Sequence, residues 1–205
     1  MHQNILNLIN NLSARNMKGY FVDTCEELTL LLEELILPES IVGCGDSVTL
    51  EETGTLNLLR NGPYQFLDKF APALSKEDKR AIYLKNFSAD TFICSANAVT
   101  VNGEIFNIDG NGSRVAPTLY GPNQVIFIIG INKITSDIDS AINRTRQITA
   151  PLDAKRLKKN TPCTSLDRCI DCKHKERICN DFVLITGQFI KDRIKVIIVN
   201  ENLGF

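Results

Sequence analysis

The sequence predicts an α/β fold built on one mainly parallel β-sheet with flanking helices. Segments with the apolar spacing of amphipathic helices alternate with short, β-prone apolar segments, which is typical of βα units. Residues 91–95 and 124–130 are nearly continuous apolar runs, as expected for strands that are buried on both faces. A length of 205 residues suits a single domain over 1–205 with a sizeable core.

In the N-terminal part of the chain, helices alternate with two short strands. Apolar residues recur at helical spacing from Ile5 to Leu12, and Lys18-Gly19 ends this first helix. Ser75 and Asp78 have the spacing of a capping box at the start of a later helix. The expected elements are helices at 5–17, 24–37, 47–60 and 75–87, with strands at 20–22 and 40–43.

The central part of the chain combines buried strands with a hairpin. Asn102-Gly103 between two apolar runs is a strong signal for a hairpin turn within 97–108. A glycine-rich turn at 109–112 and a helix to about Tyr120 follow it. The strand at 124–130 and a helix over 136–148 complete this part.

The composition changes after Pro151. Residues 153–180 are basic, rich in cysteine and poor in periodic apolar residues. We expect this segment to leave the sheet, and strands at 182–186 and 193–199 to return to it.

Composition narrows the classes of function and the compartment. The net charge of −1 gives no basic field that would attract nucleic acid. The longest apolar stretch, Val125 to Ile131, is far shorter than the ~20 residues of a membrane span. No signal peptide is evident, and an odd count of seven cysteines favours thiols or metal ligands over disulfides. We therefore expect a cytoplasmic protein that binds neither nucleic acid nor membrane.

A glycine-containing loop joins the strand at 40–43 to the next helix. Gly43 and Gly45 precede Ser47 and Thr49, so free backbone N–H groups and two hydroxyls can face a phosphate or carboxylate. The spacing is neither the P-loop nor the complete dinucleotide pattern. A tight turn with Ser47 as helix cap is the alternative. Cys44 lies in the same loop, where a helix N-terminus would lower the pKa of its thiol.

Polar residues also gather where central strands are expected to end. In open α/β sheets, ligands bind at such strand ends. Arg114 can clamp a carboxylate or phosphate, Lys133 can neutralise an anion, and Asp109 or Glu104 is a candidate base or nucleophile. An Asx-rich turn held by an Asp109–Arg114 ion pair is the alternative. The predicted ligand-binding set is Gly43, Gly45, Ser47, Thr49, Asn97, Asn107, Gly110, Arg114 and Lys133.

Four cysteines lie within a short part of the basic segment. Cys163, Cys169, Cys172 and Cys179 can hold a tetrahedral zinc ion or a 4Fe–4S cluster, although their spacing matches neither the usual zinc-finger pairs nor the ferredoxin run. A segment without its own core would gain stability from such a centre. Four surface thiols are the alternative.

Several short motifs resemble those of one known family. They are Gly43-x-Gly45-x-Ser47-x-Thr49, Ser95-Ala-Asn97-Ala-x-Thr100, Gly103-Glu104, Asn107-Ile-Asp109-Gly110, Arg114-Val-Ala, Gly121-Pro122, Gly130-x-Asn132-Lys133 and Ala150-Pro151. On these residues the chain resembles the LUD-domain family of lactate-utilization proteins, in its short form with a C-terminal cysteine motif. The resemblance implies a fold like that of the sugar-phosphate isomerase and CoA-transferase (NagB/RpiA-like) superfamily. It also implies a role in lactate-to-pyruvate oxidation beside iron–sulfur partner subunits.

These observations lead to one main hypothesis and two alternatives. The main one is a redox-linked component that binds a small 2-hydroxy or 2-oxo acid and carries an iron–sulfur cluster, or docks a partner that does. The first alternative is a non-redox enzyme for a phosphosugar or thioester with structural zinc. The second is a binding module for a small anion.

Overall fold

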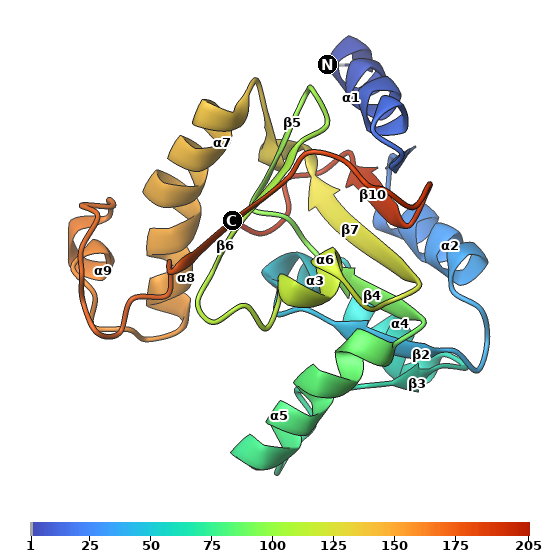
Figure 1. Ribbon diagram of the computed structural model, residues 1–205, viewed down its shortest axis with the longest axis horizontal. Helices are drawn as coiled ribbons and strands as arrows, with labels where there is room; N and C mark the ends of the chain where they lie inside the picture. Colours follow the sequence, from blue (N-terminus) through green and yellow to red (C-terminus); the bar gives the residue numbers. More distant parts are fainter. Residues whose placement is uncertain (1) are drawn as a thin grey trace.

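The computed structural model describes residues 2–205, and for His2 the backbone only. Within these residues the strands form a six-stranded sheet and a smaller four-stranded sheet, with helices around both (Figure 1). The predicted α/β class is therefore confirmed. The second sheet was not foreseen as a separate layer.

The main sheet is parallel throughout, in the order β1-β10-β7-β4-β2-β3. Its last strand in the sequence lies between β1 and β7, so the predicted return of 193–199 to the sheet is confirmed. The strand expected at 182–186 does not return to this sheet, because it pairs with the hairpin in the second sheet. The strands are β1 (Lys18–Val22), β2 (Ile41–Cys44), β3 (Gln65–Phe66), β4 (Thr91–Cys94), β7 (Gln124–Gly130) and β10 (Ile194–Val199).

Alternate residues of β7 enter two different cores, which explains its apolar run. Val125, Phe127 and Ile129 pack on the face covered by α1 (His2–Ala14) and the second sheet. Ile126 and Ile128 pack on the opposite face, against α2 (Cys25–Leu35), α3 (Val48–Glu52) and α4 (Thr55–Asn61). The central strand is therefore buried on both sides, as in other parallel sheets.

The second sheet has the order β8-β5-β6-β9, with β5 (Ala98–Thr100) and β6 (Ile105–Asp109) as the predicted antiparallel hairpin. Gly103 in its turn has φ +90°, a conformation that favours glycine. β8 (Ile134–Thr135) and β9 (Asp181–Ile185) complete this sheet. The hairpin and the cysteine-rich part of the chain are thus joined through β9.

Two of the predicted helices differ from the expectation. The helix expected over 47–60 is split into α3 and α4 at Gly54, which has φ +70°. The helix expected over 136–148 does not end before Pro151. It runs from α7 (Ile138–Arg144) through a π-helical segment, Thr145–Thr149, into α8 (Ala150–Arg156). The wider π turn accommodates the missing N–H of proline.

Shorter elements complete the chain. α5 (Lys76–Lys85) begins with the predicted capping box, in which the Ser75 side chain and Asp78 bond each other's backbone N–H. The remaining segments are the 3₁₀ turn Asn86–Ser88, α6 (Ala116–Leu119), the 3₁₀ turn Ile131–Lys133 and α9 (Cys163–Leu166). In residues 2–205, no helix combines the length and apolar character needed to cross a membrane.

Candidate functional site

A cavity of about 710 Å³ lies at the carboxyl ends of β2, β4 and β7, which are neighbouring strands of the main sheet. This edge is where ligands of open α/β sheets bind. Helix α8, the loop after β6 and the cysteine segment close its other sides. Seven of the predicted site residues line it, namely Ser47, Thr49, Asn97, Asp109, Gly110, Arg114 and Lys133.

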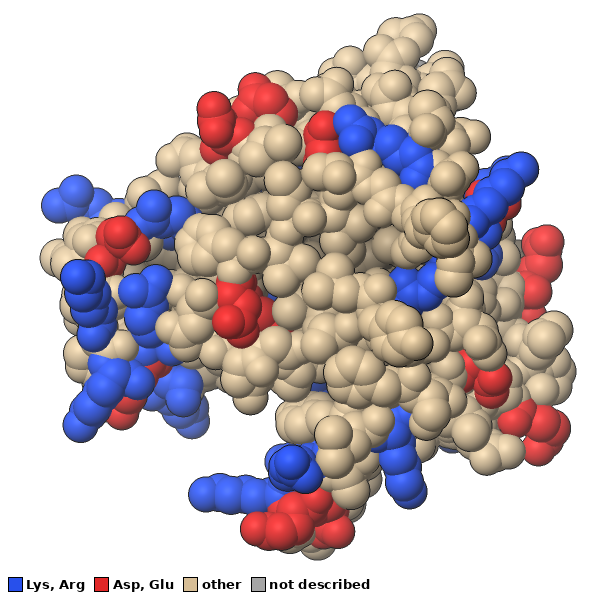
Figure 2. Space-filling view, viewed as in Figure 1, with Lys and Arg blue, Asp and Glu red and all other residues tan. Residues whose placement is uncertain are grey.

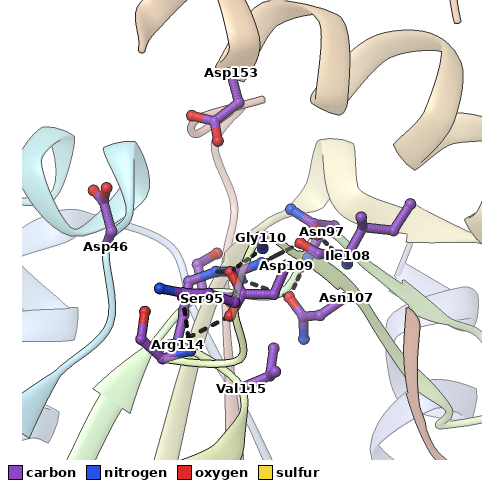
Figure 3. A network of polar contacts seen from close by, with 12 residues as sticks. Asp46, Ser95, Asn97, Asn107, Ile108, Asp109, Gly110, Arg114, Val115 and Asp153 are labelled. Carbon is purple, nitrogen blue, oxygen red and sulfur yellow. Dashed lines mark hydrogen bonds and ion pairs between the residues drawn. The ribbon is translucent and has the colours of Figure 1, made fainter. Parts of the chain in front are cut away.

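Arg114 is the centre of a hydrogen-bonded network at one wall of the cavity (Figure 3). Its Nη1 donates to the Asn107 side-chain oxygen at 2.7 Å and to the Ser95 carbonyl at 3.2 Å. Its Nη2 donates to the Ile108 carbonyl at 2.7 Å and to the Asn97 side-chain oxygen at 3.4 Å. These bonds use the terminal N–H groups of Arg114. The side chain therefore contributes a positive charge to the cavity, but its terminal N–H groups are not free to bind a carboxylate or phosphate in a bidentate manner.

Asp109 and the two asparagines fix the loop that carries Arg114. The two carboxylate oxygens of Asp109 accept the backbone N–H groups of Gly110 at 2.9 Å and Arg114 at 3.0 Å. The carboxylate also lies 3.9 Å from Arg114 Nε. The Asn107 side-chain oxygen accepts the backbone N–H of Asn97 at 3.1 Å, and the Asn97 side-chain oxygen accepts that of Ile108 at 2.8 Å. The local bonding therefore matches the alternative interpretation, a turn held by an Asp109–Arg114 ion pair. Asp109 also lines the cavity.

Lys133 lies at the floor of the cavity, just beyond β7, and is only 4% exposed. Its Nζ donates to Thr49 Oγ1 at 2.7 Å and to Ser95 Oγ at 3.0 Å. Burial, with the nearby positive charges of Arg144 and Arg114, lowers the pKa of Lys133 to about 7. The amine is therefore neutral in a large fraction of molecules at neutral pH.

The two glycines of the predicted anion loop do not line the cavity. A Cβ on Gly45 would lie 2.8 Å from Arg114 Cγ and 2.9 Å from Cys94 Cβ, and one on Gly43 would lie 2.3 Å from Asn86 Oδ1. Glycine is needed at both positions for close packing. Ser47 caps α3 by accepting the Leu50 N–H at 3.4 Å.

Two other candidate residues have different surroundings from those expected. Glu104 lies in the hairpin turn away from the cavity, where its carboxylate bonds Thr100 Oγ1 and pairs with Arg15 at 2.7 Å. Cys44 is almost fully buried, and burial raises the pKa of its thiol to about 12. The expectation of a lowered thiol pKa at Cys44 is therefore wrong, because desolvation outweighs the helix end.

Some cavity residues were not found from the sequence. Lys69 and Tyr83 come from the region around α5. Lys69 Nζ lies over the Tyr83 ring, 5.7 Å from its centre, in a cation–π contact. Arg156 on α8 pairs with Asp46 at 3.1 Å across the cavity mouth. These residues lie in loops or on a helix face, where no strand-end pattern marks them. Only their basic or aromatic character was visible.

The four cysteines predicted to bind metal line one small second cavity. All four thiols are half-buried, and none of them forms a disulfide bond. The Cys169 sulfur accepts the Asp171 N–H at 3.3 Å and lies 3.8 Å from Arg146 Nη2. Within residues 2–205, no three His, Cys, Asp or Glu side chains are grouped as a preformed site for a single metal ion.

The donors around this second cavity suit a negatively charged centre. Arg177 bonds the carbonyls of Cys172 and Cys179 at 2.7 Å, while its buried Nε lacks a hydrogen-bond partner. Thiolates bound to an iron–sulfur cluster carry negative charge that such a guanidinium can offset. The sulfurs that hold a four-iron cluster bind different irons, so they need less convergence than the ligands of one zinc ion. The segment therefore offers four thiols beside a partly unpaired guanidinium.

The two cavities share one wall. Ala150, Arg177 and Ile178 line both of them. The cysteine segment and the main cavity therefore adjoin at these three residues.

Fold and site together define an α/β protein with a cavity lined mainly by basic side chains at the strand ends and a four-cysteine segment beside it. The sequence pattern of the LUD domain matches residues 5–199, so the chain belongs to the LUD-domain family. No curated protein sequence matches the chain.

Among solved structures, a DUF162 family protein from Deinococcus radiodurans is similar over 98% of both chains, with a TM-score of 0.56 and 11% identity. This likeness supports the fold. The eIF2B beta structure from Chaetomium thermophilum has a TM-score of 0.37 and 18% identity, and the match covers 57% of this chain and 44% of that one.

Proposed function

We propose that this chain is a redox-linked component of lactate utilization, which binds a 2-hydroxy or 2-oxo acid in the main cavity and carries an iron–sulfur cluster on its cysteine segment. The observation that supports this most is the wall of Ala150, Arg177 and Ile178 between the two cavities. A redox centre and an acid would then lie close enough for electron exchange. Membership of the LUD-domain family agrees with this role.

The charges of the main cavity favour an anionic ligand. Its lining includes Lys69, Arg114, Lys133, Arg156, Lys159, Lys175 and Arg177 against Asp46, Asp109, Asp153 and Glu176. The excess of basic side chains would attract the carboxylate of the acid. Lys133, with a pKa of about 7, can accept the hydroxyl proton when lactate is oxidised.

Lactate releases two electrons and two protons when it becomes pyruvate. Lys133 would take the hydroxyl proton, and Asp109, the candidate base in the same cavity, would take the proton from Cα. A bound iron–sulfur cluster would supply a route for single electrons toward an iron–sulfur partner subunit, which we propose as the acceptor. Cys163, Cys169, Cys172 and Cys179 would hold the cluster, and Arg146 and Arg177 would offset its charge.

The surface around the cysteine segment suits such a partner. Basic side chains gather on the side of the molecule that carries α8 and α9 (Figures 1 and 2). Leu166 and Ile170 are about half exposed among them. A partner with an acidic rim and an apolar centre would complement this surface.

Anaerobic purification followed by elemental analysis and calorimetry tests the proposal. We expect iron and sulfide in equal amounts, lost in Cys169→Ser, together with binding of lactate or pyruvate that weakens in Lys133→Met. A matched variant, Cys25→Ser, changes a thiol outside the cysteine segment and should retain the iron. Protein without iron and without affinity for either acid would contradict the proposal.

The size of the main cavity favours a second candidate. Lactate would fill little of about 710 Å³, and no ion pair of Lys69, Lys159 or Lys175 is present in residues 2–205. A phosphorylated ligand, such as a phosphosugar or a thioester of a phosphorylated carrier, would use that volume and those charges. Inorganic phosphate that competes with the acid in calorimetry would favour this candidate.

A further inference from the structure

Lys133 differs from the other lysines of the molecule in its surroundings. The residue is 4% exposed, and its Nζ faces two hydroxyl groups, Thr49 Oγ1 at 2.7 Å and Ser95 Oγ at 3.0 Å. Within residues 2–205 it makes no ion pair with a carboxylate. A buried lysine without a counterion is the form of this side chain that acts as a nucleophile in proteins.

We propose that Lys133 forms a covalent imine with the carbonyl carbon of a 2-oxo acid that enters the main cavity. This inference rests on the proposed acid site and adds a covalent step to it. The 2-oxo acid combines the two features that the cavity can recognise, a carboxylate for its basic side chains and a ketone for the amine.

The electrostatics keep the amine reactive. Arg144 and Arg114 face Lys133 from α7 and from the loop after β6, and both disfavour the ammonium form, while Glu52 on α3 weakly favours it. With the pKa lowered to about 7, a large fraction of the amine is neutral at pH 7. An exposed lysine with a pKa near 10.4 has about a thousandfold less neutral amine at that pH.

The neighbouring hydroxyls fit the proton transfers of imine formation. The nitrogen lone pair attacks the carbonyl carbon, a C–N bond forms, and the carbonyl oxygen takes up a proton to give a carbinolamine. The C–O bond then breaks, the C=N bond of the imine forms, and the oxygen leaves as water. Both protons of the neutral amine leave with that water. Ser95 and Thr49, both within 3.0 Å of Nζ, can carry these protons between nitrogen and oxygen. No electrons are gained or lost in this step.

Borohydride trapping tests the proposal on the whole, unmodified chain. The protein is incubated with pyruvate, quenched with sodium borohydride after set times, and mapped by peptide mass spectrometry. We expect a reduced pyruvyl adduct on Lys133, whose rate of formation rises with pH to about 7 and then levels off. Lys195 serves as an internal control, because its pKa is also lowered by burial although it lies outside the cavity.

The outcomes separate this inference from the proposed function. Adduct on Lys133 and none on Lys195 of the same chain supports the imine. Pyruvate binding in calorimetry without adduct on Lys133 overturns the imine and leaves the acid site standing. Failure of both binding and adduct formation overturns both. Because the mapping uses the unmodified chain, the result does not depend on whether a variant folds.

Discussion

The hydrogen-bonded network around Arg114 and the cysteine segment differ in how completely the fold satisfies their polar groups. Arg114 in the cavity wall donates to four oxygen atoms of the β4–β6 region. Arg177 in the cysteine segment has a buried Nε without a partner. Of residues 157–180, Thr161 alone is buried, whereas the strands behind the cavity are buried almost throughout.

This difference indicates two kinds of site. The cavity wall is preorganised, because the chain's own hydrogen bonds fix Arg114, Asp109 and both asparagines before any ligand arrives. The cysteine segment has little apolar surface to order it, so its stability should depend on what the thiols hold. The following predictions test that contrast.

The largest expected effect is the loss of stability in Arg114→Ala. This substitution removes the Arg114 donor from the part-buried Ser95 and Ile108 carbonyls, while the Asn97 and Asn107 side-chain oxygens keep backbone donors. The free energy of unfolding should fall by about 3 kcal/mol. The matched control is Arg146→Ala in the π-helical segment, which pairs with Asp171 of the cysteine segment. Loss of this partly exposed pair should lower the free energy of unfolding by less than about 1 kcal/mol. Urea unfolding measures both. Equal losses in the two variants would remove the contrast.

A smaller effect is expected from the titration of Lys133. The folded pKa of about 7 lies below the unfolded value near 10.4, so the unfolded chain binds more protons between these values. The contribution of Lys133 to stability should therefore rise with pH, by on the order of 2 kcal/mol from pH 7 to pH 9. The buried thiols of Cys44 and Cys94, whose pKa values are raised, act in the opposite direction, so the effect is measured as the difference between the unmodified chain and Lys133→Met. Lys133→Met should lack this rise. A variant with the same pH dependence as the unmodified chain would show that Lys133 is not its source.

The smallest expected effect is that of Cys169→Ser in metal-free protein. The thiol is half-buried in a segment with few packing contacts, so the free energy of unfolding should change by less than about 0.5 kcal/mol. Hydrogen exchange should show fast exchange over 157–180 in both metal-free proteins. After reconstitution with iron and sulfide, only the unmodified chain should gain protection there. Slow exchange in the metal-free segment would contradict a metal-dependent fold.

The sequence predicted the parts of the fold that depend on local pattern. The apolar run of β7, the hairpin turn at Asn102-Gly103 and the capping box at Ser75 were predicted because short-range patterns specify each of them. The second sheet was not predicted, because β9 joins β6 from more than seventy residues further along the chain. The helix through Pro151 was missed because a π turn can absorb a proline that would otherwise end a helix.

The same limit applies to the candidate site. Strand-end residues such as Asn97 and Lys133 were placed in the cavity by the general rule for parallel sheets. The use of Arg114 within its own loop, and the distance of Glu104 from the cavity, depend on side-chain directions that spacing does not fix. Lys69 and Tyr83 were missed because they approach from a region without a pattern of its own.

The central claim is that an acid in the main cavity lies beside a redox centre on the cysteine segment. Electron paramagnetic resonance of the anaerobically purified, chemically reduced protein, titrated with pyruvate, tests it most directly. We expect an iron–sulfur signal that pyruvate changes through the shared wall of Ala150, Arg177 and Ile178. A protein without such a signal, or a signal that stays the same at saturating pyruvate, would contradict it.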